Sequence, residues 1–417
     1  MATDYTVGAQ QAADGAPREA GDGSFWYRGN LHTHTLWSDG DQYPEVVSDW
    51  YKRNGYHFLA LSDHNVLSRG ERWMGGERAA RGLETYRERF GKDWVQTREG
   101  EEGVEVRLKP LAEFRTLFEE PGRFLMIESE EITNPRAVHV NATNIAEFIP
   151  PQTGDSVRQI IERAIAAVLE QEERTGQRMF PHLNHPNFSS GVTVEEMVEI
   201  EDLRFFEIYN GHRGVRNYGD PDANFQPLER MWDIMLALRL GELGMSPLLG
   251  LAVDDAHHYE NSSSDVARPG RGWIMVKARF LTPEHIVEAI RRGDFYATSG
   301  VSLRSVERGD GRLAVEIEPE EGVEYVIEFI GTRRGFDASS EPVRDAEGNE
   351  IRATRRYSDE IGQVLKRVEG TSGAYEMSGD ELYVRARITS TKAKEDGFAE
   401  DEVEMAWVQP VVNPDSK

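Results

Sequence analysis

The stretch Asn30–Gly40, with the sequence NLHTHTLWSDG, is the part of the chain from which its fold and chemistry are best approached. His32 and His34 alternate at the end of a short apolar strand, and the period of two in a strand directs both imidazoles to the same face. Asp39 follows in a Ser-Asp-Gly turn that can bring its carboxylate back toward the two rings. Imidazole and carboxylate suit a divalent metal such as zinc, manganese or iron, so this stretch predicts part of a metal site.

The composition limits the ligands and the partners. The 417 residues include no cysteine, so a metal must be held by His, Asp, Glu or water, and thiolate nucleophiles are excluded. With 74 acidic against 48 basic residues the formal charge is −26, which argues against a nucleic acid or an anionic membrane as the main partner. Neither a signal-peptide pattern nor an apolar run of about 18 residues occurs, so we expect a cytoplasmic protein that acts on a small molecule. The sequence leaves its oligomeric state open.

Apolar strands that end in polar residues recur along the chain. A helix predicted over 43–54 separates the first strand from a second, 56–61, which runs into Ser62-Asp63-His64-Asn65. This β-α-β unit implies parallel strands with their carboxyl ends on one side, and it places His34 and His64 at equivalent rims. Further strands are predicted at 124–127, 137–143, 178–183, 205–209 and 247–253, and further helices at 155–170, 228–240 and 283–292. Such an alternation is typical of a parallel α/β barrel with its active site at the carboxyl rim.

Three parts of the chain depart from this alternation. Residues 1–23 are rich in Ala, Gly and Asp, and predict a disordered tail. Residues 66–110 show little apolar periodicity and predict an insertion or lid within a barrel that spans 24–300. From residue 301 short alternating strands separated by turns predict a small β-sandwich over 301–417.

Most of the histidines follow the same placement. Of 11 histidines, seven fall at or near the ends of predicted strands: His32, His34, His64, His139, His182, His185 and His257. Burying so many imidazoles without partners would be costly. A multinuclear metal site at the rim accounts for them together.

In their order these motifs resemble those of the PHP (polymerase and histidinol phosphatase) metallohydrolases. The matching motifs over residues 25–300 are His32-Thr33-His34 with Ser38-Asp39-Gly40, Ser62-Asp63-His64, Ser129-Glu130-Glu131-Ile132-Thr133, His185-Pro186 and Asp255-Ala256-His257. The resemblance implies the family's distorted (β/α)7 barrel. Three further segments are similar to the carbaryl-hydrolase-like branch of the family: Glu207–Gly211, Phe295–Gly300 and Ala406–Pro410.

The resemblance also implies two or three divalent metal ions, zinc, manganese or iron. The ligand set it implies is His32, His34, Glu131 and Asp255 for one metal, Glu131, His139 and His185 for a second, and Asp39, His64 and His257 for a third where present. Asp39, His64, Glu131 and His257 would take part in catalysis. Glu130 or Glu128 could replace Glu131, and Asp254 could replace Asp255, because these carboxylates stand side by side in the sequence.

Other polar residues near the rim are open to two interpretations. His182 lies three residues before His185, which places it on the opposite face of a strand. Asn210 and His212 are candidates for substrate contact or for a polar loop. A phosphate could be clamped by arginines, and the candidates are Arg69, Arg72, Arg78, Arg213 and Arg216.

Clustered divalent cations lower the pKa of a bound water from 15.7 toward about 7, and the hydroxide can attack phosphorus or a carbonyl carbon. Gly-x-Ser-x-Gly and Gly-x-x-x-x-Gly-Lys motifs are both absent from the sequence. We therefore expect a metal-dependent hydrolase, first of all a phosphoesterase acting on a small phosphomonoester or phosphodiester. The alternatives are a carbamate, ester or amide hydrolase with the same metal centre, in which Trp37, Trp73 and Tyr209 would form an apolar wall, and a non-catalytic metal-binding module.

Overall fold

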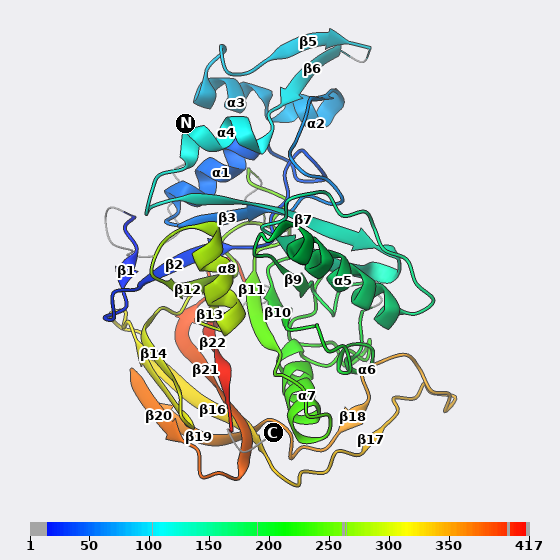
Figure 1. Ribbon diagram of the computed structural model, residues 1–417, viewed down its shortest axis with the longest axis vertical. Helices are drawn as coiled ribbons and strands as arrows, with labels where there is room; N and C mark the ends of the chain where they lie inside the picture. Colours follow the sequence, from blue (N-terminus) through cyan, green and yellow to red (C-terminus); the bar gives the residue numbers. More distant parts are fainter. Residues whose placement is uncertain are drawn as a thin grey trace.

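The computed structural model describes residues 15–101, 103–189, 191–260, 263, 265–397 and 401–413. It confirms a mixed α/β protein with a large central sheet (Figure 1). The helices are α1 (Pro44–Arg53), α2 (Gly76–Arg81), α3 (Leu83–Phe90), α4 (Leu111–Phe118), α5 (Val157–Thr175), α6 (Val194–Met197), α7 (Leu228–Gly241) and α8 (Pro283–Arg292), with a 3₁₀ turn η1 (Pro135–Ala137).

The first half of the central sheet carries the motifs. Its strands lie in the order β11–β10–β9–β8–β7–β3–β2. Their bounds are β2 (Phe25–Asn30), β3 (Phe58–Leu61), β7 (Leu125–Asn134), β8 (Val138–Thr143), β9 (Phe180–Leu183), β10 (Phe205–Asn210) and β11 (Leu249–Val253). β2, β3 and β7 pair in parallel, as do β9, β10 and β11, so their carboxyl ends point the same way.

One strand of this half runs against the predicted parallel order. β8 is antiparallel to both β7 and β9. Only the three residues of η1 connect β7 to β8, and so short a connection allows a hairpin but no crossover to a parallel strand. The prediction of an all-parallel sheet is therefore wrong at this strand.

The expected barrel does not form a closed ring of strand ladders among the described residues. Over Ile274–Ala278, β12 (Trp273–Ala278) pairs with β2, so β11 has no ladder with that strand. Beyond the strand ends the two edges still meet, through a parallel bridge between Thr33 and Ala256 and a hydrogen bond from His34 N to Ala256 O of 3.0 Å. The seven strands thus curve until the segments that follow β2 and β11 lie side by side.

Helix ends follow ordinary capping chemistry. The Ser156 side chain accepts from Gln159 N at the start of α5, and Gly176 ends this helix in a left-handed conformation. In α8 the Thr282 side chain accepts from His285 N, Pro283 occupies the first turn, and Gly293 ends the helix with φ +77°. α8 has its predicted bounds, whereas α5 continues five residues past its predicted end at residue 170, up to the capping Gly176.

The C-terminal stretch is built of strands, and several of them extend the central sheet. The order continues from β2 through β12, β13 (Phe295–Thr298), β22 (Val403–Val412), β21 (Glu381–Ala393), β16 (Tyr325–Arg333) and β19 (Gln363–Glu369). A three-stranded sheet of β14 (Leu303–Gly309), β15 (Arg312–Ile317) and β20 (Ser372–Glu376) shares a buried apolar cluster with β16 and β21. β17 (Ser340–Glu341) and β18 (Arg356–Tyr357) form a small separate pair. Because β13 pairs with β22, hydrogen bonding is continuous across residue 300, and a domain boundary there remains a prediction.

Strands also occur in residues 66–110 and in the N-terminal stretch 1–23, the two other parts of the chain where the sequence lacks the β-α alternation. Residues 66–110 contain β4 (Arg72–Met74), β5 (Thr97–Gly100) and β6 (Gly103–Leu108), which pair in the order β4–β6–β5 beside α2 and α3. We call residues 66–110 the insertion. Of the predicted disordered tail, residues 1–14 lie outside the described residues, whereas β1 (Arg18–Glu19) pairs with β2, so the predicted disorder does not extend through residues 18 and 19.

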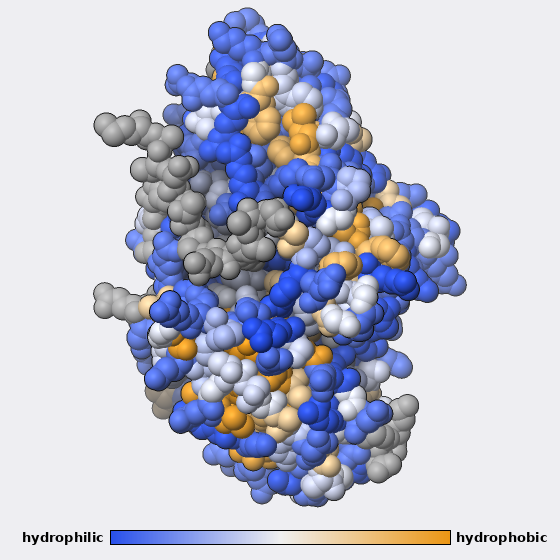
Figure 2. Space-filling view, turned by 90° about the vertical axis from the view of Figure 1, so that its left-hand side faces the viewer, coloured by the Kyte–Doolittle hydropathy of each residue, from blue (hydrophilic) through white to orange (hydrophobic). Residues whose placement is uncertain are grey.

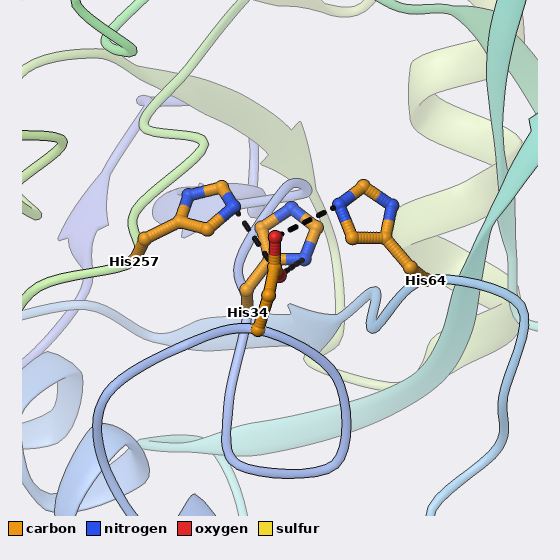
Figure 3. Close-up of side chains that lie close together, drawn as sticks. His34, His64 and His257 are labelled. Carbon is orange, nitrogen blue, oxygen red and sulfur yellow. Dashed lines mark ion pairs between the residues drawn. The ribbon is translucent and has the colours of Figure 1, made fainter. Parts of the chain in front are cut away.

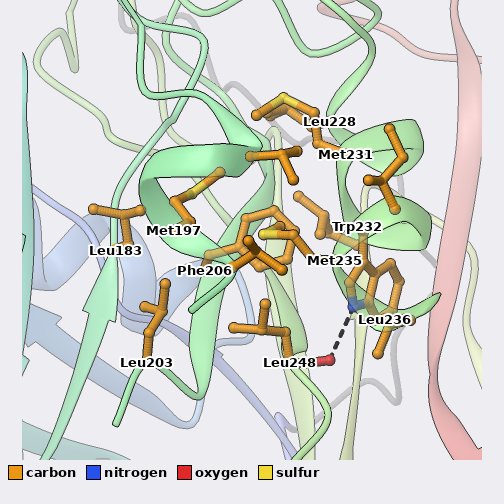
Figure 4. Packing of buried hydrophobic residues seen from close by; sticks show 14 of the residues in the cluster. Leu183, Met197, Leu203, Phe206, Leu228, Met231, Trp232, Met235, Leu236 and Leu248 are labelled. Atoms are coloured by element: carbon orange, nitrogen blue, oxygen red, sulfur yellow. Dashed lines mark hydrogen bonds between the residues drawn. The ribbon is translucent and has the colours of Figure 1, made fainter. Parts of the chain in front are cut away.

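Apolar side chains fill the interior of the protein. Figure 4 shows Met231, Trp232 and Met235 of α7 packed around Phe206 of β10, and the Trp232 indole donates to Leu248 O at 2.9 Å. The face in Figure 2 is mostly hydrophilic, with hydrophobic residues in small separate groups. None of the helices that the structure describes is long and apolar enough to cross a membrane.

Candidate metal centre

Glu131 is the residue around which the histidines gather. It lies near the end of β7 and is fully buried, and its two oxygens face imidazole nitrogens from five separate positions. The distances are 2.8 Å to His64 Nδ1, 2.8 Å to His139 Nδ1, 3.3 Å to His32 Nε2, 3.3 Å to His34 Nε2 and 3.5 Å to His185 Nε2. The carboxylate therefore faces His139 and His185 through Oε1, and His32, His34 and His64 through Oε2.

Asp255 faces the same rings from the end of β11. Its Oδ1 lies 3.1 Å from His34 Nε2 and 3.3 Å from His32 Nε2, and its Oδ2 lies 3.8 Å from His185 Nε2. The backbone of Asp255 has φ +49°, a conformation that costs energy for a residue with a side chain. This turn directs the carboxylate into the rim rather than along the strand.

Asp39 belongs to a more open part of the centre. Its carboxylate lies 3.4 Å from His64 Nε2, 3.4 Å from His257 Nε2 and 3.6 Å from His34 Nδ1, and Figure 3 shows how the three imidazoles converge from different segments. The Asp39 side chain is 53% exposed, whereas that of Glu131 is 0% exposed. The group around Asp39 is therefore the outer part of the centre.

The turn after Asp39 folds tightly onto the first motif. A Cβ on Gly40 would lie 2.6 Å from both C and O of His34 and 2.7 Å from Thr35 N. Such contacts leave room only for glycine. The Ser-Asp-Gly turn thus brings Asp39 back to the histidines, as its sequence predicts.

All nine predicted ligands fall into four overlapping groups whose donor atoms lie within 4.8 Å of one another. These groups are His34, Asp39, His64 and His257; His32, His34 and Asp255; His32, Glu131 and His185; and His64, Glu131 and His139. No residue of the described part of 301–417 belongs to any of them. The site is therefore formed by the first half of the central sheet.

The alternative carboxylates point elsewhere. Glu130 is on the opposite face of β7, where its Oε1 accepts from Ile149 N at 2.7 Å, and Glu128 pairs with Arg69. Asp254 accepts from Arg271 N and Gly272 N at 2.7 and 2.9 Å. Because side chains alternate along a strand, Glu131 and Glu130 point to opposite faces of β7. Asp254 instead binds the backbone N–H groups of Arg271 and Gly272.

Glu207 is a residue of the site that sequence reasoning did not assign. It is fully buried in β10, its Oε1 lies 2.7 Å from His32 Nδ1, and its Oε2 accepts from His185 N at 2.7 Å. A carboxylate behind one ring nitrogen orients the other nitrogen toward the centre. The signal in the sequence was a single acidic residue inside the apolar strand FFEIYN, because a buried carboxylate requires a partner.

Two asparagines complete the polar network behind the ligands. Asn184 donates to Glu131 Oε1 at 2.9 Å, and Asn210 donates to Glu207 Oε2 at 2.8 Å and to Asp255 Oδ2 at 3.1 Å. Asn210, a candidate for substrate contact, thus supports two carboxylates. These bonds hold the carboxylates in fixed orientations.

The charges of the centre act strongly on one another. Burial alone would raise the pKa of Glu131, but His64 and His32 outweigh it and hold the pKa of this carboxyl well below its usual range. Burial lowers the pKa of His64, yet Glu131 and Asp39 outweigh burial and raise that pKa to about 11. For His34, burial together with His257 lowers the pKa to about 3. Glu131 therefore favours its charged form, and a proton is favoured on His64 but not on His34.

The donor set fits divalent cations. His32 Nε2 and Glu131 Oε2 are buried and lie 3.3 Å apart, and neither makes a hydrogen bond of good geometry, although Glu131 Oε2 also lies 2.8 Å from His64 Nδ1. Buried polar atoms normally have hydrogen-bond partners, so two of them together indicate an interaction other than a hydrogen bond. All donors are nitrogen or oxygen, which permits zinc, manganese or iron.

The other candidates have different places. His182 lies behind the centre, with Nε2 3.3 Å from Glu207 Oε1, and His212 packs edge-on to His257 at a centroid distance of 5.3 Å.

The five candidate arginines contact protein groups: Arg69 contacts Glu128, Arg72 contacts Trp37 O, Arg78 contacts Ser38 O, Arg213 contacts Asp265 and Arg216 contacts Asp220. Of the three residues predicted to form an aromatic wall, Trp37 and Tyr209 are buried in separate apolar cores, and Trp73 lies half-buried in β4.

Comparisons with known proteins add two remote similarities. No protein-family model and no curated protein matches the chain. A two-domain protein from Bacteroides vulgatus that contains a predicted PHP-like metal-dependent phosphoesterase shares 15% identity, covering 96% of this chain and 100% of that one, with a TM-score of 0.40. A protein from Bifidobacterium adolescentis assigned as a metal-dependent phosphoesterase shares 13% identity over 58% of this chain and 92% of its own, with a TM-score of 0.28. Scores of this size do not establish a common fold or family.

Proposed function

We propose that this chain is a metal-dependent hydrolase of the PHP type, and that its nine convergent side chains hold two or three divalent cations. The observation that carries the proposal is the convergence of Asp39, Glu131 and Asp255 on six imidazoles, with buried donor atoms left without hydrogen bonds. A structural cluster would satisfy those atoms within the protein. When bound, the cations would supply Lewis acidity and an activated water.

The chain's own residues would hold the cations in place. Glu207 fixes His32 through Nδ1, so that Nε2 is left for a cation, and Asn210 fixes Asp255. Glu131 belongs to two of the groups and would be a ligand in both. The exposed side of Asp39 leaves the outer group open to a substrate from solution.

A phosphomonoester or phosphodiester is the substrate class we favour. The groups that share Glu131 would hold two cations close together, and such cations would supply Lewis acidity to a phosphoryl group. The carbaryl-hydrolase-like resemblance suggests a carbamate or ester instead. Two of the three residues predicted to form an apolar wall for such a substrate, Trp37 and Tyr209, are buried, which supports the phosphate ester instead.

The test compares four substrates on one preparation. Metal-loaded protein is assayed with an aryl phosphate, a bis-aryl phosphate, an aryl ester and an aryl carbamate, each beside chelator-treated protein and the His32→Ala/His34→Ala variant. We expect turnover of a phosphate ester that the chelator and the double substitution both abolish. Chelator-sensitive turnover of the carbamate or ester alone would show that the substrate is a carbamate or ester and not a phosphate ester. No turnover of any of the four substrates would favour the non-catalytic metal-binding module.

A further inference from the structure

The insertion builds its own core against the loop that carries Asp39. Leu36, Trp37 and Tyr43 from that loop share a buried apolar cluster with Ala79 and Tyr86 of the insertion. The rings of Tyr43 and Tyr86 stack at a centroid distance of 4.1 Å, and the Tyr43 hydroxyl donates to Ala79 O at 2.6 Å. The packing of the insertion and the position of the loop are therefore coupled.

One arginine of the insertion holds the backbone on both sides of Asp39. Arg78, in α2, donates from Nη2 to Ser38 O and to Gly40 O, each at 2.8 Å. The two carbonyls belong to the residues on either side of Asp39, so the guanidinium holds the backbone before and after it. A hydrogen bond from a charged donor is stronger than one between neutral groups.

A second arginine strengthens the same attachment. Arg72, in β4, donates from Nη1 to Trp37 O at 2.6 Å, and its guanidinium lies 5.4 Å from the centre of the Trp37 ring. The insertion therefore binds the backbone carbonyls of residues 37, 38 and 40. Neither arginine is among the residues that face the histidines.

Asp39 depends on such support more than the other carboxylates do. Glu131 is fully buried and held by Asn184, and Asp255 is held by Asn210, whereas the side chain of Asp39 is 53% exposed. A ligand on an exposed loop loses affinity when the loop moves, because binding must then order the loop. The outer cation therefore depends on how firmly the loop is held.

We propose that the insertion, through Arg78, positions Asp39 and thereby sets the affinity of the outermost divalent cation. Arg78 is a positioning residue and contacts no cation itself. The inference rests on the proposed function only in that a cation binds at Asp39, and it does not depend on the substrate. Coupling is reciprocal, so occupation of the outer position should also protect the insertion from local unfolding.

The test measures Mn²⁺ binding without substrate. Mn²⁺ is titrated into chelator-treated protein and the free ion is followed by electron paramagnetic resonance, for the wild type, Arg78→Ala and Arg87→Ala. Arg87 is the matched control, because it belongs to the same insertion and its bond to Thr97 stays within it. We expect Arg78→Ala to weaken the most weakly held Mn²⁺ by roughly 10- to 100-fold, the usual effect of losing a group that orients a ligand, and Arg87→Ala to leave it unchanged.

A double-mutant cycle separates positioning from general damage. In an Asp39→Asn background Arg78→Ala should cause no further loss, because the positioned ligand is already gone. Equal Mn²⁺ affinity in Arg78→Ala and the wild type, or an equal loss in both backgrounds, would overturn the proposal. If Arg78→Ala does not fold, Arg78→Lys carries the same cycle. A wild type that binds Mn²⁺ in this way yet cleaves none of the four substrates would refute the proposed activity and leave the positioning role intact.

Discussion

At the scale of single residues, Glu131 is the carboxylate that faces the largest number of histidines in the centre. A fully buried carboxylate is unfavourable unless it is paired, and here five imidazoles face one group. Stability does not require so many ionisable partners in one place. The arrangement is therefore better explained by binding than by folding, and the residues behind the ligands are the ones whose role can be measured separately.

Glu207→Gln tests the support behind His32. The carboxamide keeps the shape of the side chain, but its NH2 group would face either His32 Nδ1 or His185 N, which now both lie 2.7 Å from a carboxylate oxygen. We expect divalent-metal affinity to fall by roughly 10- to 100-fold. The measurement is a metal titration by calorimetry, with Glu128→Gln as control because Glu128 pairs with Arg69. An unchanged affinity would show that Glu207 does not orient His32.

Glu45→Gln tests a buried carboxyl outside the metal centre. Glu45 accepts from Tyr86 OH at 2.6 Å and Trp94 Nε1 at 2.9 Å, and burial raises its pKa above the ordinary value of 4.5. Between the ordinary and the raised pKa the folded state binds more protons than the unfolded state, so this residue lowers stability as the pH rises above 4.5.

We therefore expect Glu45→Gln to gain stability relative to the wild type as the pH rises from 5 to 8. Urea unfolding at both pH values measures this difference, and Glu77→Gln, at an exposed position of α2, should show no such trend. A difference that does not change with pH would contradict the raised pKa.

At the scale of elements, α7 is attached to the C-terminal strands by a buried ion pair. Arg385 of β21 donates from Nε and Nη2 to the two oxygens of Asp233 on α7, each at 2.7 Å, and the Tyr383 hydroxyl donates to the same carboxylate at 2.8 Å. The other face of α7 packs on β10, which ends at the metal centre. This contact therefore links the C-terminal strands to the strand that carries Glu207.

Asp233→Ala should be strongly destabilising. It removes the bidentate partner of the fully buried Arg385 and leaves Glu229, 3.1 Å from Nη2, as its partner, so we expect a loss of up to about 3–5 kcal/mol, the cost of a broken buried pair. The free energy of unfolding from urea titration measures the loss. Glu199→Ala, which removes the exposed partner of Arg158, should cost only about 0–1 kcal/mol. Comparable losses in both variants would mean that the buried pair has no special role.

At the scale of the whole molecule, the centre is assembled from segments that span more than half of the chain. Its residues run from His32 to His257; they follow the ends of β2, β3, β9 and β11 or lie within β7 and β8. The bridge between Thr33 and Ala256 brings the first and last of these segments together. Any cation bound there would connect strands that are distant in the sequence, so binding and folding should be linked.

Divalent metal should stabilise the whole fold. A ligand that binds only the folded state adds about 2.7 kcal/mol at a concentration 100 times its dissociation constant. We expect the unfolding temperature to rise when Mn²⁺ or Zn²⁺ is added to chelator-treated protein, as measured by scanning calorimetry. The His32→Ala/His34→Ala variant should lose this response, and an equal rise in that variant would indicate binding elsewhere.

The sequence alone predicted the types of the candidate ligands, their order and the segments that carry them. Without cysteine the donors had to be nitrogen or oxygen, and the period of two in His32-Thr33-His34 predicted two rings on one face. Polar strand ends placed His34 and His64 at a common rim. These features depend only on composition and on neighbouring residues, which is why they could be read without a structure.

Only the tertiary structure decided which neighbouring carboxylate faces the centre and which residues support it. The register of β7 against β8 turned Glu131 inward and Glu130 toward Ile149, and the pairing of β9 with β10 placed Glu207 behind His32 and His185. The short turn before β8 made that strand antiparallel, and the pairing of β12 with β2 left the strand ladders open. All of these outcomes depend on pairings between separate segments, whose energies no local pattern in the chain contains.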